Sequence, residues 1–231
     1  MTGASPGRAL QAVLVDLDGT LVDTEPYWTT GERELTARYG ITWTAADALE
    51  MVGNDLLVSG HHLHGKGVAL APERIVEVLV AEVRKRLLDQ VPWLPGARSL
   101  LTGLADAGVP VALVTMSYRR LVDAFLLDVP TGWFGAVVTG DEVSRGKPHP
   151  EPYRRAAELL GVDPARCVAI EDSRTGLASA EAAGCVTVAV PHLLEIEPAP
   201  GRTVVESLED VDVDVFEGLV GLTRSRSPSA R

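Results

Sequence analysis

The chain has 231 residues, of which 46% are hydrophobic and 23% charged, and its formal net charge is −11. This mixture is typical of a globular protein with one large domain, or with a core that carries an inserted lobe. The negative charge argues against nucleic acid and anionic membranes as partners, because both require a basic surface. We therefore expect no nucleic-acid partner and no membrane partner.

The first eleven residues, 1–11, are small and polar, and we predict a flexible segment there. They hold no apolar segment of the kind that a secretory signal needs, and no apolar stretch of the chain reaches transmembrane length. Cys167 and Cys185 each begin an apolar run, which favours buried free thiols over a disulfide or redox pair. Together these features predict a cytoplasmic protein.

The apolar run Ala12–Val15 is followed by Asp16, Leu17, Asp18, Gly19 and Thr20. Such a run is typical of a short buried strand that ends at a turn. Because alternate strand residues share a face, Asp16 and Asp18 point the same way. Burying two like charges costs on the order of several kcal/mol unless a cation lies between them, and Mg²⁺ prefers oxygen ligands of this kind. The segment therefore indicates a magnesium site, with a plain turn as the alternative.

Residues 23–93 show helical periodicity and almost no strand signal. The clearest predicted helices are Pro26–Tyr39 and Glu73–Leu88, each with a proline near its first turn. We predict that this block is a helical lobe inserted between the first two strands of the sheet. The chain would leave the core at Leu21–Glu25 and return at Trp93–Gly96.

The remainder of the chain alternates short apolar runs with amphipathic segments. This order predicts an α/β fold, in which helices cover both faces of a parallel sheet. The core is expected to comprise residues 12–22 and 94–222, and the Ser- and Arg-rich tail 223–231 is expected to be disordered. The further predicted strands are Val111–Thr115, Ala136–Thr139, Cys167–Ile170 and Val186–Val190, and the predicted helices are Tyr118–Leu127, Pro150–Leu160 and Ser173–Ala183.

Three later segments place polar residues where predicted strands end. Thr115 and Met116 precede a predicted helix. A hydroxyl group and free N–H groups at this position can bind a phosphate oxygen, or the hydroxyl can cap the helix. Lys147 lies in a rigid Gly-Lys-Pro segment, and it is interpreted either as a cation that pairs with phosphate or as a lysine exposed to solvent. Glu171 and Asp172 follow another predicted strand. We interpret them either as metal-binding residues or as caps of the next helix. An open α/β sheet collects such residues at one edge, where ligands bind.

The four segments, in this order, resemble the motifs of the haloacid dehalogenase-like hydrolase superfamily over about residues 12–219. The resemblance implies a Rossmann-like core with a helical cap inserted after the first strand. It also implies that Asp16 attacks a phosphoryl group and forms an aspartyl-phosphate. Asp18 matches the general acid/base, and its backbone carbonyl would join Asp16 in binding Mg²⁺. The dehalogenases of this superfamily lack the second aspartate, so its presence points to phosphoryl transfer.

The same resemblance assigns the other polar residues of these segments. Thr115 and Met116 match phosphate-binding positions, Met116 through its backbone N–H. Lys147 would pair with the nucleophile and with the transferring phosphate. Asp172 matches a metal ligand, and Glu171 would stand behind it or reach the metal through a water.

The resemblance is closest to the β-phosphoglucomutase-like phosphatases. Asp23–Pro26 matches the segment after the first motif, and Glu25 would face the substrate or cap the following helix. Met51–Asp55 resembles a specificity loop of the cap, with Gly53 and Asn54 as substrate-facing residues. Mutases carry an arginine shortly after this glycine to hold a second phosphate, and no arginine follows here. The sequence therefore favours a phosphatase over a mutase.

We accordingly expect a Mg²⁺-dependent phosphatase that hydrolyses a small phosphorylated metabolite, such as a sugar phosphate, beneath a closing cap. We expect it to act as a monomer or weak homodimer. The alternatives are a sugar-phosphate mutase that uses the same intermediate, and a non-enzymatic protein that binds a phosphorylated metabolite. The neighbouring histidines His61, His62 and His64 fit no metal-ligand spacing, and we expect them at the surface or facing the substrate.

Overall fold

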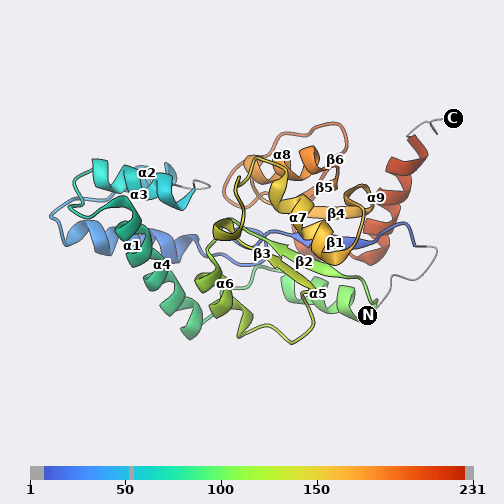
Figure 1. Cartoon of the computed structure of the whole chain (residues 1–231), viewed down its shortest axis with the longest axis horizontal. Coiled ribbons are helices and arrows are strands. Elements are labelled where there is room, and N and C mark those ends of the chain that lie inside the picture. The colour runs from blue at the N-terminus through green and yellow to red at the C-terminus, as the bar shows by residue number, and fades with distance from the viewer. Residues whose placement is uncertain (1–7, 52–54, 227–231) are drawn as a thin grey trace.

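The computed structural model of the chain describes residues 8–51 and 55–226, with side-chain surroundings as far as Thr223. In this part of the chain six parallel strands form one sheet, in the order β3-β2-β1-β4-β5-β6 (Figure 1). The central strand β1 therefore has β2 on one side and β4 on the other. The strands are β1 (Ala12–Val15), β2 (Val111–Val114), β3 (Ala136–Val138), β4 (Cys167–Glu171), β5 (Val186–Ala189) and β6 (Arg202–Val204).

The helices that cover the two faces of this sheet are α5 (Ala97–Asp106), α6 (Arg119–Leu126), α7 (Glu151–Leu160), α8 (Arg174–Ala183) and α9 (Val213–Arg226). Val13 and Val15 of β1 share a hydrophobic cluster with α5, α6 and α9, whereas Ala12 and Leu14 share one with α7 and α8. Strand residues alternate between the faces, so a strand covered on both sides is apolar throughout. The architecture confirms the predicted Rossmann-like α/β core.

The predicted strands and helices of the core agree with the observed ones to within two residues at each end. Strand β6 was not predicted, because Arg202 and Thr203 are polar and only half-buried and Val204 is exposed, so no apolar run marks the strand. Helices α5 and α9 were not predicted either. Both cysteines are free thiols: Cys167 is buried at the start of β4 and Cys185 is half-buried before β5.

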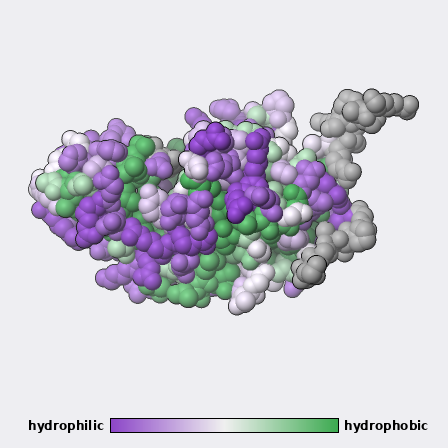
Figure 2. All heavy atoms as spheres, viewed as in Figure 1, coloured by the Kyte–Doolittle hydropathy of each residue, from purple (hydrophilic) through white to green (hydrophobic). Residues whose placement is uncertain are grey.

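Four further helices of the described residues lie beyond the edge of the sheet where the strands end, and they form the inserted helical cap (Figure 1). They are α1 (Glu25–Ala37), α2 (Ala45–Leu49), α3 (Leu56–Gly65) and α4 (Pro72–Asp89). The cap has a hydrophobic cluster of its own, which contains Leu35, Trp43, Leu63 and Ile75. Its surface is largely hydrophilic in Figure 2. A second cluster joins α4 to α6 and so packs the cap against the core.

The two chain crossings between core and cap lie side by side. Val22 forms an antiparallel bridge with Trp93, and the N–H of Asp23 donates to the carbonyl of Pro92 at 2.9 Å. These contacts lie where the sequence predicted the exit and the return of the chain. The division into a core of residues 12–22 and 94–222 and a cap of residues 23–93 stays a prediction at its residue limits.

The start of the described chain is held against the core, unlike the flexible segment predicted for residues 1–11. Leu10 is buried. The N–H groups of Ala9 and Leu10 both donate to Oε2 of Glu217 in α9, at 3.1 and 3.0 Å. The other carboxylate oxygen of Glu217 pairs with Arg8 at 2.7 Å. The prediction was wrong for residues 8–11 because a polar stretch gives no sign of a distant carboxylate that can bind its backbone.

The other terminal prediction, a disordered tail over residues 223–231, was wrong for its first four residues. Helix α9 continues through Arg226. The hydroxyl of Thr223 donates to the carbonyl of Leu219, one turn earlier, at 3.0 Å. Ser and Arg composition alone does not show that a preceding helix continues into such a segment. None of the helices in the described part of the chain combines the length and apolar character that crossing a bilayer requires.

Replacing Glu217 tests the anchoring of the N-terminal residues. The change Glu217→Ala removes the acceptor of two backbone N–H groups and the partner of Arg8. We expect it to lower the free energy of unfolding by about 1–3 kcal/mol, measured by urea denaturation. Glu206→Ala, at an exposed position, is the control and should leave the stability nearly unchanged. Equal effects of the two changes would contradict this anchoring.

Candidate active site

The polar residues that the sequence singled out meet at the edge of the sheet where the strands end, facing the cap. Asp16 follows β1, Thr115 follows β2, and Glu171 is the last residue of β4. All of these strands are parallel, so their carboxyl ends reach the same edge. Lys147 arrives there from the loop before α7. The structure thus brings four distant segments of the chain to one place.

Lys147 is the centre of this arrangement. Its side chain is only 4% exposed, and its Nζ lies 2.5 Å from Oδ1 of Asp16 and 2.6 Å from Oε1 of Glu171. It also donates to the carbonyl oxygen of Val114 at 2.9 Å. Burial alone would lower the pKa of Lys147, but the charges and hydrogen bonds of the two carboxylates raise it above its ordinary value. The lysine therefore stays charged and fixes both acids in position.

Asp16, 6% exposed, lies in this ion pair with one face toward the cap. Burial raises the pKa of Asp16 to about 7; the charge of Lys147 opposes the rise, while Glu171 and Asp18 add to it. Burial likewise raises the pKa of Asp172 well above its ordinary value, with Asp16 as the next cause. Carboxylates buried this closely favour a bound cation, which would offset their desolvation and mutual repulsion.

The acids that could hold such a cation form one cluster. Oxygens of Asp16, Glu171 and Asp172 all lie within 4.8 Å of one another. Glu171 is already engaged, because it accepts hydrogen bonds from Tyr153 at 2.6 Å and Ser173 at 3.0 Å in addition to Lys147. Asp16 and Asp172 are therefore the carboxylates that are best placed to bind a metal, and Glu171 serves to hold the lysine.

Two glycines make room for these carboxylates. A Cβ at Gly19, whose φ is +81°, would lie 2.0 Å from Oδ2 of Asp172. A Cβ at Gly176 would lie 2.0 Å from the carboxylate carbon of Glu171. No side chain can be added at either position without moving an acid of the cluster. The glycine in the first motif is thus required by a close approach as well as by its turn.

Asp18 is held by three hydroxyl groups. Thr24 donates to its Oδ1 at 2.5 Å, while Ser117 and Thr115 donate to its Oδ2 at 2.8 and 3.2 Å. Thr115 also accepts a hydrogen bond from the N–H of Ser117 at 2.9 Å. The predicted phosphate-binding residue Thr115 therefore contacts the predicted acid/base, and its role toward phosphate stays a prediction. Neither Thr24 nor Ser117 was predicted from the sequence as a partner of Asp18.

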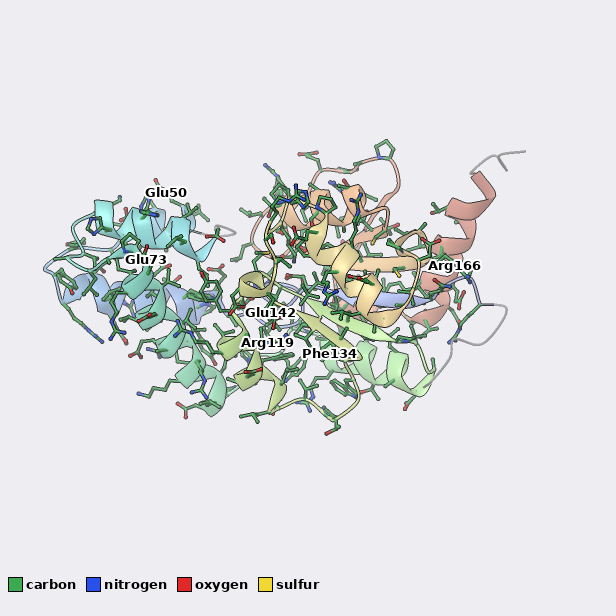
Figure 3. The ribbon with its side chains drawn as sticks, in the orientation of Figure 1. Glu50, Glu73, Arg119, Phe134, Glu142 and Arg166 are labelled. Atoms are coloured by element: carbon green, nitrogen blue, oxygen red, sulfur yellow. The ribbon has the colours of Figure 1, made fainter. Side chains whose placement is uncertain are left out.

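An ion pair fixes the loop that carries Thr115 and Ser117. Arg119, at the start of α6, and Glu142 extend toward each other near the sheet edge (Figure 3), with Nη2 and Oε2 2.6 Å apart. The backbone N–H of Arg119 donates to Oδ1 of Asp141 at 2.9 Å. These contacts join the segment after β3 to the segment after β2, and so hold the hydroxyl groups in place against Asp18.

A cavity of about 150 Å³ lies between the sheet edge and the cap. On the core side it is lined by Asp16, Asp18, Gly19, Thr115, Met116, Ser117, Lys147, Asp172, Ser173 and Thr175, with Leu193 and Leu194 from the segment after β5. The cap contributes Glu25, Trp28, Glu32, Met51, Leu56, Ser59, Val76 and Leu79.

The cap residues of this cavity differ in part from the predicted ones. Glu25 lines the cavity as expected, and its pKa is raised to about 7 by burial, then by Asp18 and Glu32. Gly53 and Asn54 lie outside the described residues. The sequence analysis missed Glu32, although its spacing contained a signal: Glu25, Trp28 and Glu32 are three and four residues apart, and so share one face of α1.

The three neighbouring histidines lie on α3. None of them is among the residues that line the cavity formed by the described part of the chain. His61 and His64 are exposed, and Nδ1 of His64 lies 2.8 Å from the carbonyl oxygen of Leu70. His62 lies 3.7 Å from a carboxylate oxygen of Glu50. Their position agrees with the expected surface location.

Comparison with known proteins identifies the family to which this site belongs. The family model described as "haloacid dehalogenase-like hydrolase" matches residues 10–184 of the chain. The chain is a haloacid dehalogenase-like hydrolase. Hexitol phosphatase A of Escherichia coli K12 is 33% identical over 87% of the chain and 92% of its own length. The bifunctional riboflavin kinase/FMN phosphatase of Arabidopsis thaliana is 35% identical over 78% of the chain, which spans only 48% of that longer protein.

Solved structures of this family agree with the fold. CbbY from Rhodobacter sphaeroides, crystallised with phosphate, matches 90% of the chain and 99% of its own with a TM-score of 0.78 at 25% identity. A β-phosphoglucomutase from Clostridium difficile matches 94% of the chain and all of its own with a TM-score of 0.78; at 21% identity it supports the fold alone. Family membership and relatives named phosphatases place the chain among the phosphoric monoester hydrolases.

Replacing Lys147 tests its pairing with the buried acids. The change Lys147→Met leaves Asp16 and Glu171 buried without their cation. We expect it to lower the free energy of unfolding by about 3–5 kcal/mol in buffer without divalent ions, measured by chemical denaturation. Lys66→Met is the control, because Lys66 pairs with Asp47 on the cap surface and should contribute little. A loss for Lys147→Met as small as that of the control would contradict the buried pairing.

Glu32 generates a prediction about pH. Burial raises the pKa of Glu32 from 4.5 to about 7 in the folded chain. Above pH 7 the carboxylate is charged in both the folded and the unfolded chain, and burying this charge destabilises the folded chain. Below pH 4.5 the carboxyl group is protonated in both. We therefore expect Glu32→Gln to stabilise the chain by about 1–3 kcal/mol at pH 8 and not at pH 4. Denaturation across this range measures the difference.

The matched control is Glu34→Gln, on the same helix but at the surface, where Glu34 pairs with Arg86. Its stability relative to wild type should change little between pH 4 and pH 8. If Glu32→Gln shows no more pH dependence than this control, the burial of the Glu32 charge is contradicted.

Proposed function

We propose that the chain is a Mg²⁺-dependent phosphatase that hydrolyses a small phosphorylated metabolite, such as a sugar monophosphate, through an aspartyl-phosphate on Asp16. The observation that carries the proposal is the position of Asp16: its carboxylate is held by Lys147 at the floor of the cavity, in one site with Asp18 and Asp172. The names of the relatives, among them hexitol phosphatase A, support a sugar or polyol phosphate.

Asp16 is suited to act as the nucleophile. Its Oδ1 is fixed by Lys147 at 2.5 Å, and it attacks the phosphorus atom with its other oxygen. The attack forms a bond between Asp16 and phosphorus and breaks the bond between phosphorus and the leaving oxygen. Lys147 balances the charge of the phosphoryl oxygens as well as that of Asp16. Mg²⁺, bound by Asp16, Asp172 and the backbone carbonyl of Asp18, would reduce the repulsion between the carboxylate and the anionic ester.

Asp18 is suited to act as the acid and then the base. In the first step it donates a proton to the leaving oxygen. In the second it takes a proton from a water whose oxygen attacks the phosphorus atom, and the bond between Asp16 and phosphorus breaks to release inorganic phosphate. The hydroxyl groups of Thr24, Ser117 and Thr115 hold its carboxylate in one orientation for both steps. Thr115 and Met116 line the cavity beside Lys147, and we retain them as phosphate-binding residues.

The proposal predicts that Asp16→Asn loses the hydrolysis of p-nitrophenyl phosphate by about 10³-fold or more in the presence of Mg²⁺, because an amide cannot act as the nucleophile. Release of p-nitrophenol is the measurement. Asp106→Asn, at an exposed position of α5, is the control and should retain wild-type turnover. Substantial turnover by Asp16→Asn, or turnover by wild type that persists in excess chelator, would contradict the proposal.

The product distinguishes the proposed phosphatase from the mutase that the sequence left as an alternative. With β-glucose 1-phosphate as substrate, a phosphatase releases inorganic phosphate, whereas a mutase yields glucose 6-phosphate. We expect free phosphate. A protein that only binds a phosphorylated metabolite would release neither product while the metabolite still raises its melting temperature.

A further inference from the structure

We propose that the cap end of the cavity is a subsite for hydrogen-bond donors of the leaving group, hydroxyl or ammonium, with Glu32 as the acceptor and as the residue that excludes a second anionic group. This inference rests on the proposed phosphatase function and names the class of its substrate: a phosphomonoester whose far end is neutral or cationic, and neither a bisphosphate nor a phosphorylated carboxylic acid.

Glu32 is buried, yet it lines the cavity. It is 5% exposed, and it lies on the face of α1 that also carries Glu25 and Trp28. The indole N–H of Trp43 donates to its Oε2 at 3.1 Å, and Trp43 is itself packed in the hydrophobic cluster of the cap. The carboxylate is therefore held in one orientation by a rigid partner.

The second oxygen of this carboxylate, Oε1, is able to accept a further hydrogen bond. Within the described ranges, no side chain or backbone group donates a hydrogen bond to Oε1 of Glu32. A buried carboxylate that is short of donors is costly, and burial accordingly raises the pKa of Glu32. A ligand that brings a hydroxyl or ammonium group to the cap end would supply the missing donor.

The surrounding charges favour the same class of ligand. Glu25 also lines the cavity, so that two carboxylates face the leaving group from α1. Among the described residues that line the cavity, Lys147 is the only basic one, and it is paired with Asp16 and Glu171 on the core side. A second phosphate or a carboxylate at the cap end would meet two acids and no counter-ion, which selects against it.

The rest of the cap wall adds few polar contacts. Trp28, Leu56, Val76 and Leu79 present mainly apolar surface, and Ser59 adds one hydroxyl group. In a cavity of this kind a small number of polar groups decides which ligand is accepted. Glu32 is thus the side chain from which discrimination at the far end of the substrate is expected.

A matched series of phosphate esters tests the subsite, because its members share one carbon chain and differ at the end away from the phosphate. Sorbitol 6-phosphate ends in a hydroxyl, 1-amino-1-deoxysorbitol 6-phosphate in an ammonium, 6-phosphogluconate in a carboxylate and sorbitol 1,6-bisphosphate in a phosphate. Values of kcat/KM are measured at pH 8 with Mg²⁺ for the wild-type protein, Glu32→Gln and Glu34→Gln.

We expect the wild-type protein to prefer the hydroxyl or ammonium compound over the two anionic ones by about 100-fold or more. Glu32→Gln should reduce this preference at least about tenfold, mainly by raising kcat/KM for the anionic compounds, because the amide removes the charge. Glu34→Gln should leave the preference unchanged. If the wild-type protein alone favours the ammonium compound about tenfold over the hydroxyl compound, the subsite prefers amines. Equal rates would show that it accepts both groups.

Three outcomes would overturn the inference: equal hydrolysis of all four compounds, a preference that Glu32→Gln leaves intact, or hydrolysis of p-nitrophenyl phosphate with none of the four. If p-nitrophenyl phosphate is not hydrolysed either, the proposed function has failed. Calorimetric measurement of binding of the four compounds to the wild-type protein and to Glu32→Gln then tests the subsite on its own. The inference predicts the same order of affinities as that expected for kcat/KM. It is overturned if the anionic compounds bind the wild-type protein as tightly as the hydroxyl and ammonium compounds.

Discussion

The pairing of one buried lysine with two buried acids is the constraint on which this site depends. Lys147 cannot be taken out of water without partners, and the acids Asp16 and Glu171 supply them at 2.5 and 2.6 Å. Tyr153 and Ser173 hold Glu171 in turn, so the pair is fixed from α7 and from the segment after β4. Lys147 thereby opposes the protonation of Asp16 that burial favours, and it holds this carboxylate in one position at the cavity.

The sheet supplies the geometry that this pairing needs. β1 lies in the middle, with β2 and β4 on either side, so the residues that follow these three strands reach one edge within contact distance of each other. The inserted cap leaves the core directly after β1 and returns before α5, which places α1 opposite that edge. In the proposed function the core carries out the chemistry and the cap recognises the leaving group, with Glu25 and Glu32 lining the cavity from the cap.

Much of the candidate site could be predicted from the sequence, because most of its polar residues directly follow or end apolar runs. A strand buried on both faces reads as an apolar stretch, and Asp16, Thr115 and Glu171 follow or end such stretches. The partners Thr24 and Ser117 could not be predicted in the same way, because a hydroxyl gives no sign of which distant carboxylate it will meet. Glu32 shares a helix face with Glu25 by its spacing, but which face of a helix borders a cavity depends on how the cap sits over the core, and Glu32 was missed for that reason. The anchoring of residues 8–10 involves Glu217, more than 200 residues away.

The central claim is that Asp16 becomes covalently phosphorylated, and chemical trapping tests it most directly. The wild-type protein is mixed with a substrate and Mg²⁺, quenched during turnover and treated with borohydride, which reduces an acyl phosphate to an alcohol. Mass spectrometry of the peptide that contains residue 16 should then show homoserine in place of Asp16. Active turnover with an unmodified Asp16, or with the reduction at another acid, would contradict the account.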